Sequence, residues 1–392
     1  MNVQEKFDVD GSLGLYVLVP FCSSPCDFCA FYQKKPSKNS IKIYLEALDF
    51  EFLRLASLHS VDTIFFGGGT PGVLTANQLT ALCQMVAGRV GDFLEWTVEL
   101  APIEVTDEKL KVLKDFGVNR ISLGIQTFDL AFLKELGRNH PPDKALRSYE
   151  MIRRHDFESV NVDLLFGAPS QELSDWEKDL RTAVDLEPDH VSTYCLTFEE
   201  DTAIYARLSK GEIKIDRKRE AAFYKLAWEF LPSCGLFQYE VSNFSLEGKQ
   251  CLHNINTWLM GEWVGCGPSA ASQFTGKRFR NLSDLDSWSE ALQSGRPPPR
   301  EEEVVLDRLD LARDAILFGL RLNQGINPNS ILKRFSLPLD SLSGILDFLD
   351  QLVDGELACK SEPGNYYLNR DGRMLADAIM NEMPELSEIS LV

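Results

Sequence analysis

Three cysteines stand within eight residues, Cys22, Cys26 and Cys29, directly after a short apolar run. Cysteine thiolates are the usual ligands of iron–sulfur clusters, and three of them at this spacing can face one cluster. A structural zinc site needs a fourth ligand close by, and neither a histidine nor another cysteine occurs between Lys34 and Phe52, which weakens the zinc alternative. Three protein ligands leave one iron open for a further ligand. The loop therefore predicts an iron–sulfur cluster with an open site.

A glycine run, Gly67-Gly68-Gly69-Thr70-Pro71, follows the next apolar stretch. Glycines let the backbone approach a ligand closely and expose its N–H and C=O groups. A tight turn alone would also explain the run, so the motif gains weight from its position one strand after the cysteine loop.

Polar residues interrupt three later apolar stretches: Glu99, Gln126 and Asp163. Such groups are costly to bury without partners, so each needs either a structural hydrogen bond or a ligand. Taken singly, a structural hydrogen bond is as good an explanation. Their recurrence along successive stretches favours contacts with a shared ligand.

The elements that would carry these residues alternate between strand and helix from Leu15 to about Phe198. Short β-rich runs predict six strands, at Leu15–Pro20, Asp62–Phe66, Glu95–Leu100, Arg120–Ile125, Ser159–Phe166 and His190–Thr197. Helices are predicted between them, at Ser40–Leu58, Thr75–Gly88, Asp107–Phe116, Pro142–His155 and Ser174–Asp185. This alternation indicates a parallel sheet covered by helices. Six units are too few for a closed barrel of eight, so the predicted fold class is α/β, a partial (β/α)6 TIM-type barrel with its chemistry at the carboxyl ends of the strands.

The pattern changes after Thr197. A helix is predicted at Asp216–Leu231, an irregular segment at Tyr239–Gly276 and a proline-rich linker at Ser294–Arg300. Beyond it the sequence predicts helices and a short hairpin, at Leu306–Leu322, Pro328–Phe335, Leu339–Asp354, Ala358–Cys359 and Tyr366–Leu368. This smaller α-rich C-terminal domain is similar to a winged helix, although the acidic Glu301–Glu303 favours packing over DNA binding. The predicted division is 1–14, 15–235, 236–300 and 301–392.

Composition narrows the class of protein. The chain has 392 residues and a formal net charge of −19, which disfavours binding to nucleic acid because affinity for phosphates comes mainly from Lys and Arg. No apolar run is long enough for a membrane span, and the start of the chain lacks the pattern of a signal peptide. A cytoplasmic location is therefore expected. In a reducing compartment, clustered cysteines indicate metal ligands rather than disulfides.

The spacing C-x₃-C-x₂-C with Phe28 before the third cysteine resembles the radical S-adenosylmethionine superfamily. The resemblance implies that Cys22, Cys26 and Cys29 hold a [4Fe–4S] cluster whose fourth iron is chelated by S-adenosylmethionine. It also implies that the reduced cluster cleaves the cofactor to a 5′-deoxyadenosyl radical, and that the glycine run contacts the methionine amino group.

A closer resemblance, over nearly the whole chain, is to the oxygen-independent coproporphyrinogen III oxidase family. It is carried by the stretches LYVLVPFCSSPCDFC, IFFGGGTPGVL, VNRISLGIQTF, LKELGRNH, NVDLLFGAPSQ and HNINTWLMGEWVGCG. By this resemblance, the contacts to the cluster-bound cofactor are Tyr16, Gly68 and Glu99. Further S-adenosylmethionine contacts are implied for Gly69, Thr70, Gln126, Arg138, Asp163 and Thr197.

Within that family the chain is more similar to the heme chaperone branch, called HemW. The oxidases carry a fourth cysteine where this chain has Phe31, and they have a longer N-terminal extension. The branch motif HNxxYW is matched from His253 to Trp258 except for Thr257 in place of Tyr, and Ala271 replaces a histidine of a later motif. The resemblance makes His253 the first candidate ligand to heme iron and Cys266 the second, with a capping role as the alternative for His253.

Three functions remain open from the sequence. The first is a heme chaperone with a [4Fe–4S] cluster and S-adenosylmethionine, whose partners are heme or porphyrin, a heme-accepting apoprotein and an electron donor. The second is a radical enzyme that decarboxylates a porphyrinogen or transfers a methyl group. The third is a non-catalytic binding module in which the cluster supports folding. The sequence alone does not decide between catalysis and heme carriage.

Overall fold

The computed structural model describes residues 11–24, 26–55, 61–138 and 140–384. The predicted segment 1–14 falls mostly outside the described residues, as does the predicted helix end at 56–58. No helix within the described ranges is long and apolar enough to cross a membrane.

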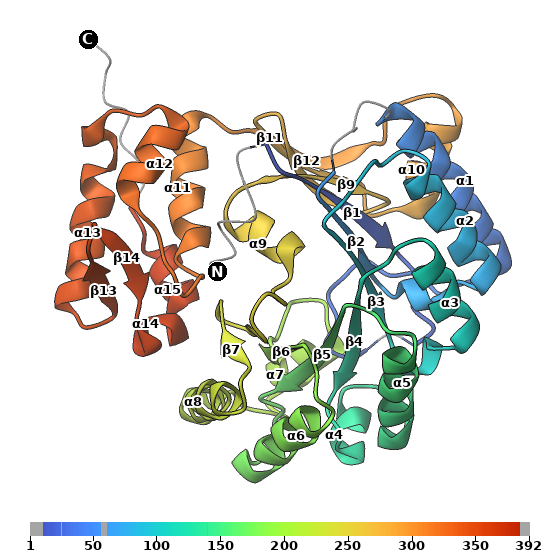
Figure 1. Ribbon diagram of the computed structural model, residues 1–392, viewed down its shortest axis with the longest axis horizontal. Helices are drawn as coiled ribbons and strands as arrows, with labels where there is room; N and C mark the ends of the chain where they lie inside the picture. The colour runs from blue at the N-terminus through green and yellow to red at the C-terminus, as the bar shows by residue number, and fades with distance from the viewer. Residues whose placement is uncertain (1–10, 25, 56–60, 139, 385–392) are drawn as a thin grey trace.

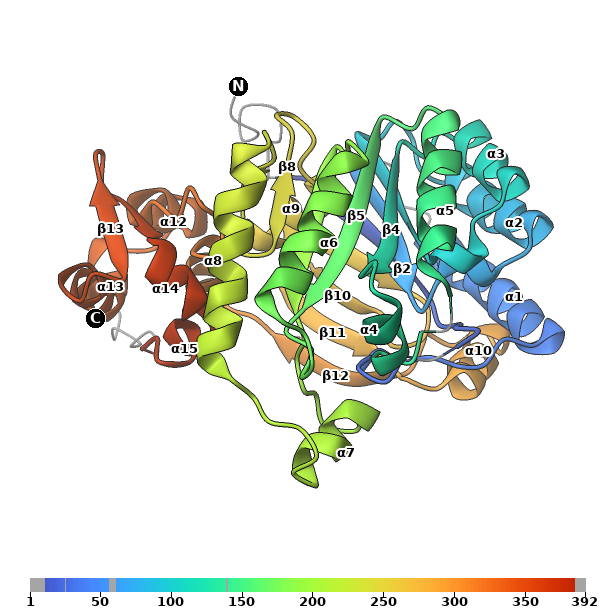
Figure 2. The same ribbon diagram turned by 90° about the horizontal axis from the view of Figure 1, so that it is seen from below.

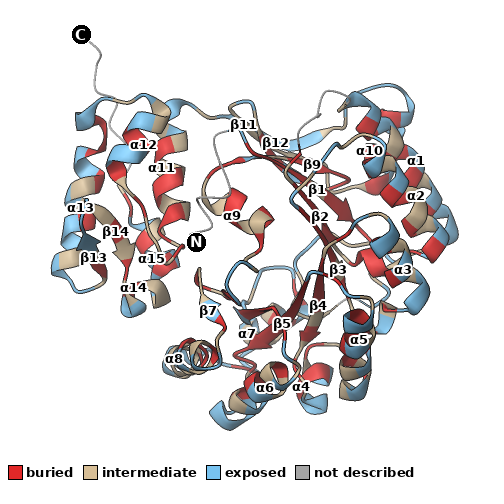
Figure 3. Ribbon diagram, in the orientation of Figure 1, coloured by how far each residue is buried: buried red, intermediate tan, exposed pale blue. Residues whose placement is uncertain are grey.

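Six parallel strands pair in sequence order and form the curved sheet that carries the site (Figure 1). They are β1 (Leu13–Val19), β2 (Thr63–Gly68), β3 (Glu95–Leu100), β4 (Arg120–Gln126), β5 (Ser159–Phe166) and β6 (His190–Cys195). Nearly all of their residues are buried (Figure 3), as expected for strands covered on both faces.

Helices cover the outer face of this sheet (Figure 2). They are α1 (Lys38–Arg54), α2 (Ala76–Ala87), α3 (Asp107–Asp115), α4 (Leu130–Glu135), α5 (Pro142–Arg154) and α6 (Leu173–Asp185). Side-chain caps fix several helix starts; for example, Thr75 accepts a hydrogen bond from Gln78 N at the start of α2. The predicted partial (β/α)6 barrel is confirmed, and its strands and main helices begin and end within a few residues of the predicted positions. The sequence did not predict α4 or α7 (Ala203–Ser209), because each has too few turns for a clear period.

The segment Tyr239–Gly276 is ordered structure, so the prediction of an irregular region is wrong. It contributes β8 (Asn243–Ser245), α9 (Leu252–Trp258), β9 (Glu262–Cys266) and β10 (Ala271–Phe274). Strand β9 pairs in parallel with β1 and continues the barrel sheet on its other side. These elements are too short to show a clear period of apolar residues. Strand β9 also pairs with a strand more than 200 residues earlier in the chain, so the local sequence does not predict its place in the sheet.

The sheet is completed to twelve strands by antiparallel additions at both ends. They are β7 (Phe237–Gln238), β11 (Lys277–Asn281) and β12 (Arg300–Val305), and helices α8 (Arg217–Ser233) and α10 (Leu285–Gln293) pack outside. Strand β12 crosses the predicted domain boundary at residue 300.

The C-terminal part lies beside the open side of the barrel, with α9 between the two (Figure 1). Its elements are α11 (Arg308–Gly319), α12 (Pro328–Phe335), α13 (Ser343–Asp354), β13 (Ala358–Ser361), β14 (Asn365–Leu368), α14 (Arg370–Met374) and α15 (Ala376–Asn381). The predicted hairpin is confirmed, since β13 and β14 pair antiparallel. Arg334 of α12 donates to the carbonyls of Leu259 and Met260 at the end of α9, which ties this part to the barrel.

Candidate functional site

The cysteine loop follows β1 and is held by backbone hydrogen bonds on both sides. Cys22 N donates to Lys34 O at 3.2 Å, and Cys29 N donates to Cys26 O at the same distance. Asp27 N donates to Leu136 O after α4, and Asp27 O accepts from Ile204 N of α7. The two short helices that the sequence did not predict thus fix the middle of the loop.

The three thiols lie close enough to influence one another. Burial raises the pKa of Cys22 and of Cys29, and Cys26 raises both further, whereas a backbone hydrogen bond at each thiol and the Arg138 guanidinium lower both. A cationic group beside a thiol favours the thiolate that a metal requires. In the described part of the chain, no three His, Cys, Asp or Glu side chains converge as ligands of a single ion would.

The glycine turn after β2 lies directly against the cysteine loop and the barrel interior. Gly69 N donates to Val19 O and Thr70 N to Phe21 O. A Cβ at Gly69 would collide with the carbonyl of Phe21, and a Cβ at Gly67 would lie 2.8 Å from Glu99 Oε2. The glycines are therefore required by close packing against the chain itself, and the contact of this run with a cofactor stays a prediction.

Three predicted cofactor contacts lie on alternate strands of the barrel, Tyr16 on β1, Glu99 on β3 and Asp163 on β5. Each residue keeps a small solvent-accessible fraction, while its ionisable group is enclosed by protein atoms. The Tyr16 hydroxyl and the Glu99 carboxylate both lie within about 3 Å of the position that a Cβ of Gly67 would occupy. Glu99 in turn lies close enough to Asp163 for their charges to interact, so the three side chains form one cluster beside the glycine turn.

Two more predicted contacts meet at the carboxyl end of β4. Arg138 Nη1 donates to Gly124 O at 2.8 Å, and Gln126 Nε2 lies 3.0 Å from the position that a Cβ of Gly124 would occupy. The predicted Thr197 is exposed in the loop after β6. The structure thus brings Gln126 and Arg138 together over Gly124.

Buried acids dominate the electrostatics of the interior. The pKa of Glu99 is raised to about 8, mainly by burial and also by the Asp163 charge, against the opposing effects of the Gly68 backbone and Arg120. Burial also raises the pKa of Asp163, against hydrogen bonds from Ser122 and Asn161. Without a cationic ligand, Glu99 is therefore held mostly protonated at neutral pH.

This raised pKa predicts a pH dependence of stability for the cofactor-free protein. Because Glu99 keeps its proton in the folded state up to about pH 8 while the unfolded chain loses it near 4.5, the native state binds more protons in this window. The contribution of Glu99 to stability is thus fully present below pH 4.5 and falls by up to about 1.4 kcal/mol per pH unit until pH 8. Urea unfolding at pH 6 and pH 8 of the wild type and Glu99→Gln tests this. The wild type should lose more stability than the variant, and equal losses would contradict the shift.

His253 lies inside the barrel at the amino ends of β1 and β2. Its Nδ1 is 2.9 Å from Thr63 Oγ1, and its ring packs 5.2 Å from Phe65 and 6.2 Å from Tyr16. Burial lowers the pKa of His253 to about 4, so the imidazole is neutral and can offer a nitrogen lone pair. The residue is 7% exposed.

Cys266, the second candidate heme ligand, lies on the opposite face of the sheet from the barrel interior. It pairs with Val17 and is fully buried in the core near Tyr44 and Glu51 of α1. A heme could reach it only by unpacking α1.

Two groups in the interior were missed by sequence reasoning. Glu95, at the start of β3, accepts from the backbone N–H groups of Leu252 and His253 at the start of α9. Tyr194 is 39% exposed in β6, two residues after Ser192, which hydrogen-bonds Asn161. The period of two along a strand could have placed Tyr194 on the interior face with Ser192.

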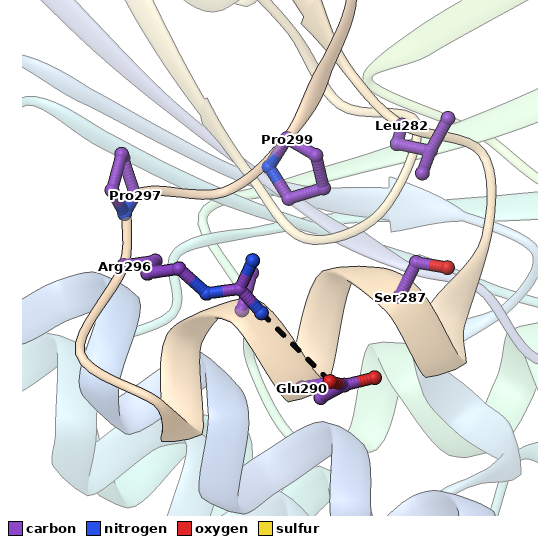
Figure 4. Close-up of a pocket in the computed structure, with 7 residues that line it drawn as sticks. Leu282, Ser287, Glu290, Arg296, Pro297 and Pro299 are labelled. Carbon is purple, nitrogen blue, oxygen red and sulfur yellow. Dashed lines mark ion pairs between the residues drawn. The ribbon is translucent and has the colours of Figure 1, made fainter.

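A pocket of about 430 Å³ lies away from these residues, between α10 and the proline-rich linker (Figure 4). The ion pair Glu290–Arg296, at 3.8 Å, crosses it beside Pro297 and Pro299. It includes none of the predicted site residues.

The residues at the barrel mouth fit the predicted cofactors. Thr70 Oγ1 and Arg138 Nε are buried without a hydrogen-bond partner among the described residues, so both are available to a ligand. The thiols of the cysteine loop lie near Arg138, and one phenol and two carboxyl groups cluster inside the barrel. A sulfur-ligated cluster with a polar organic cofactor matches this donor set.

Comparison with known proteins identifies the family. The radical SAM superfamily profile matches residues 16–183. The heme chaperone HemW of Bacillus subtilis is 32% identical over 372 residues, which cover 93% of this chain and 97% of that protein. HemW of Lactococcus lactis is 33% identical over 87% of this chain and 89% of that protein. The structure of coproporphyrinogen III oxidase from Escherichia coli superposes with a TM-score of 0.81 over 94% of this chain and 89% of that chain, at 23% identity, which shows a shared fold.

The superfamily relation implies S-adenosylmethionine and a [4Fe–4S] cluster, in agreement with the cysteine loop and glycine turn. The aligned residues, 32% and 33% identical overall, cover most of this chain and of both HemW proteins. This chain therefore belongs to the HemW family of the radical SAM superfamily.

Proposed function

We propose that this chain is a heme chaperone, which binds heme and passes it to an apoprotein, and that it holds a [4Fe–4S] cluster with S-adenosylmethionine. The observation that carries the proposal is the similarity to heme chaperones along nearly their whole length. The absence of a fourth cysteine at Phe31 and the match to HNxxYW support the same function.

In this proposal Cys22, Cys26 and Cys29 hold the cluster. Tyr16, Gly68 and Glu99 contact the bound S-adenosylmethionine, and further contacts come from residues within or after the strands: Gly69, Thr70, Gln126, Arg138, Asp163 and Thr197. The cluster and its cofactor, when bound, supply one-electron chemistry, for which an electron donor is required. The chain's own groups bind and orient the cofactor and exclude water.

His253 is the proposed heme ligand. Its support is the neutral imidazole, whose Nδ1 shares a hydrogen bond with Thr63 Oγ1; in the tautomer in which Nδ1 donates, Nε2 keeps its lone pair for iron. Because His253 is 7% exposed and its ring packs against Tyr16 and Phe65, heme iron reaches it in this proposal only when these side chains move.

Heme titration of the reconstituted protein tests the function. We expect a Soret shift that saturates at a fixed stoichiometry in the wild type and an affinity at least about tenfold lower in His253→Ala, because one axial ligand is lost. His155→Ala, which removes a surface imidazole paired with Asp107, is the matched control and should bind as the wild type does.

No Soret shift in the wild type would overturn the heme chaperone proposal. Conversion of coproporphyrinogen III by the same preparation would instead favour the oxidase. An unchanged affinity in His253→Ala would move the heme ligand to another residue.

A further inference from the structure

The end of β4 carries an irregularity at a residue that the proposed function uses. The pairing of β4 with β5 shifts register between Leu123 and Gln126, and Gln126 has φ 72°, in the left-handed region. A residue other than glycine holds this conformation only when its surroundings enforce it. Bulges of this kind redirect side chains beside functional sites.

The enforcing group comes from outside the barrel. Asp179 of α6 is 3% exposed, and both of its carboxylate oxygens accept hydrogen bonds from the two residues after Gln126. Thr127 Oγ1 donates to Oδ2 at 2.6 Å, and Phe128 N donates to Oδ1 at 2.9 Å. Thr127 Oγ1 in turn accepts from Asp129 N at 3.0 Å. The carboxylate therefore clamps the backbone where it leaves the strand.

The charge state of Asp179 suits this clamp. Burial raises its pKa to about 6, with smaller contributions from Asp129 and Asp175, and the hydrogen bonds from Thr127 and Phe128 oppose the shift. At pH 7.5 the group is ionised, so both oxygens accept and the hydrogen bonds are charge-assisted.

On the interior side of the sheet, the same bend determines the positions of the Gln126 and Arg138 side chains. The Gln126 amide folds back over Gly124, whose carbonyl accepts from Arg138 Nη1 at 2.8 Å. A change in the backbone at Gln126 would shift the Gly124 carbonyl and, with it, the guanidinium. Arg138 and Gln126 are therefore linked to Asp179 through the backbone from Gly124 to Phe128, and the hydrogen bonds of the Asp179 carboxylate go to Thr127 and Phe128.

We propose that Asp179 is a positioning residue that orients Gln126 and Arg138 for S-adenosylmethionine by fixing the bend after β4. This inference rests on the proposed cofactor site. Asp179 acts through the backbone of Thr127 and Phe128 and does not contact the cofactor.

The test compares Asp179→Ala with Asp189→Ala. Asp189 is also a buried acid that accepts from a backbone N–H, of Val160, and from a side chain, Arg153, but it lies at the amino ends of β5 and β6. Equilibrium dialysis of cluster-loaded protein should show that S-adenosylmethionine binds at least about tenfold more weakly in Asp179→Ala. The Asp189→Ala variant should retain wild-type affinity for S-adenosylmethionine, even if its stability falls as much as that of Asp179→Ala.

Rescue separates positioning from general destabilisation. In Asp179→Asn the amide oxygen can still accept from Phe128 N and the amide nitrogen can donate to Thr127 Oγ1, so most of the affinity should return. Hydrogen exchange in the cluster-free protein should show a protected Phe128 amide in the wild type and loss of that protection in Asp179→Ala.

The inference would be overturned if Asp179→Ala bound S-adenosylmethionine as tightly as the wild type. It would also be overturned if the Phe128 amide of Asp179→Ala still exchanged its hydrogen slowly. Failure of the wild type itself to bind S-adenosylmethionine would instead overturn the proposed cofactor site. The exchange measurement on the cluster-free protein would still decide whether Asp179 fixes the bend.

Discussion

Each of the single variants Cys22→Ala, Cys26→Ala and Cys29→Ala should lose cluster binding. Two thiolates from one loop cannot hold four irons firmly, and in the described residues no other cysteine lies in this loop to take the place of the missing ligand. Iron and sulfide analysis after anaerobic reconstitution, together with the visible spectrum, measures the effect. The wild type should be brown and carry a full load, and each variant should fall to background.

Cys234→Ala provides the control, because this thiol is exposed after α8 and is not part of the loop. It should reconstitute as the wild type does. A full iron and sulfide load in any of the three loop variants would show that the cluster is held elsewhere. Uptake of zinc alone by the wild type would refute the iron–sulfur assignment.

Replacement of Glu95 by alanine should destabilise the cofactor-free protein by about 3 kcal/mol or more. The Glu95 carboxylate accepts from Leu252 N at 2.9 Å and from His253 N at 3.1 Å, and so caps α9 from the barrel. It also offsets the charge of Arg120, which is 3% exposed and has Nε unpaired. Removing it leaves the two buried α9 amides without an acceptor and takes away one of the acidic groups, with Asp163, that offset the buried charge of Arg120. Urea unfolding measures the loss.

Two further variants separate the causes. Glu95→Gln keeps an oxygen for the α9 amides but removes the charge beside Arg120, so its cost should lie between those of the wild type and the alanine variant. Thr63→Val removes only the hydrogen bond to His253 Nδ1 and should cost about 1 kcal/mol. A loss below about 1 kcal/mol in Glu95→Ala would mean that solvent replaces the carboxylate and that α9 is not held from the barrel.

Local patterns in the sequence determined the parallel part of the fold. The six strands are continuous apolar runs separated by amphipathic helices with clear caps, and such patterns depend only on near neighbours. The cysteine spacing and the glycine run are likewise local, because their chemistry lies within a few residues. The cluster loop and its position after β1 could therefore be read directly from the residues.

Contacts between distant segments decided what the sequence left open. Strand β9 joins β1 across more than 200 residues, and α9 is capped by Glu95, which lies 157 residues before Leu252. The bend at Gln126 depends on Asp179, which accepts a hydrogen bond from the amide of Phe128, 51 residues earlier in the chain. A pattern of near neighbours carries no signal for such pairs, since each depends on where the folded sheet places the partner.

The same reason governs the interior. Sequence spacing suggested that Glu99, Gln126 and Asp163 share a ligand, but only the curvature of the sheet places Tyr16 and Glu99 beside Gly67, and Arg138 beside Gly124. It also buries Cys266 under α1 while His253 enters the barrel. Residue types and spacing determined which chemistry this chain could carry, and tertiary packing decided which side chains face one another, because burial and approach are properties of the whole sheet.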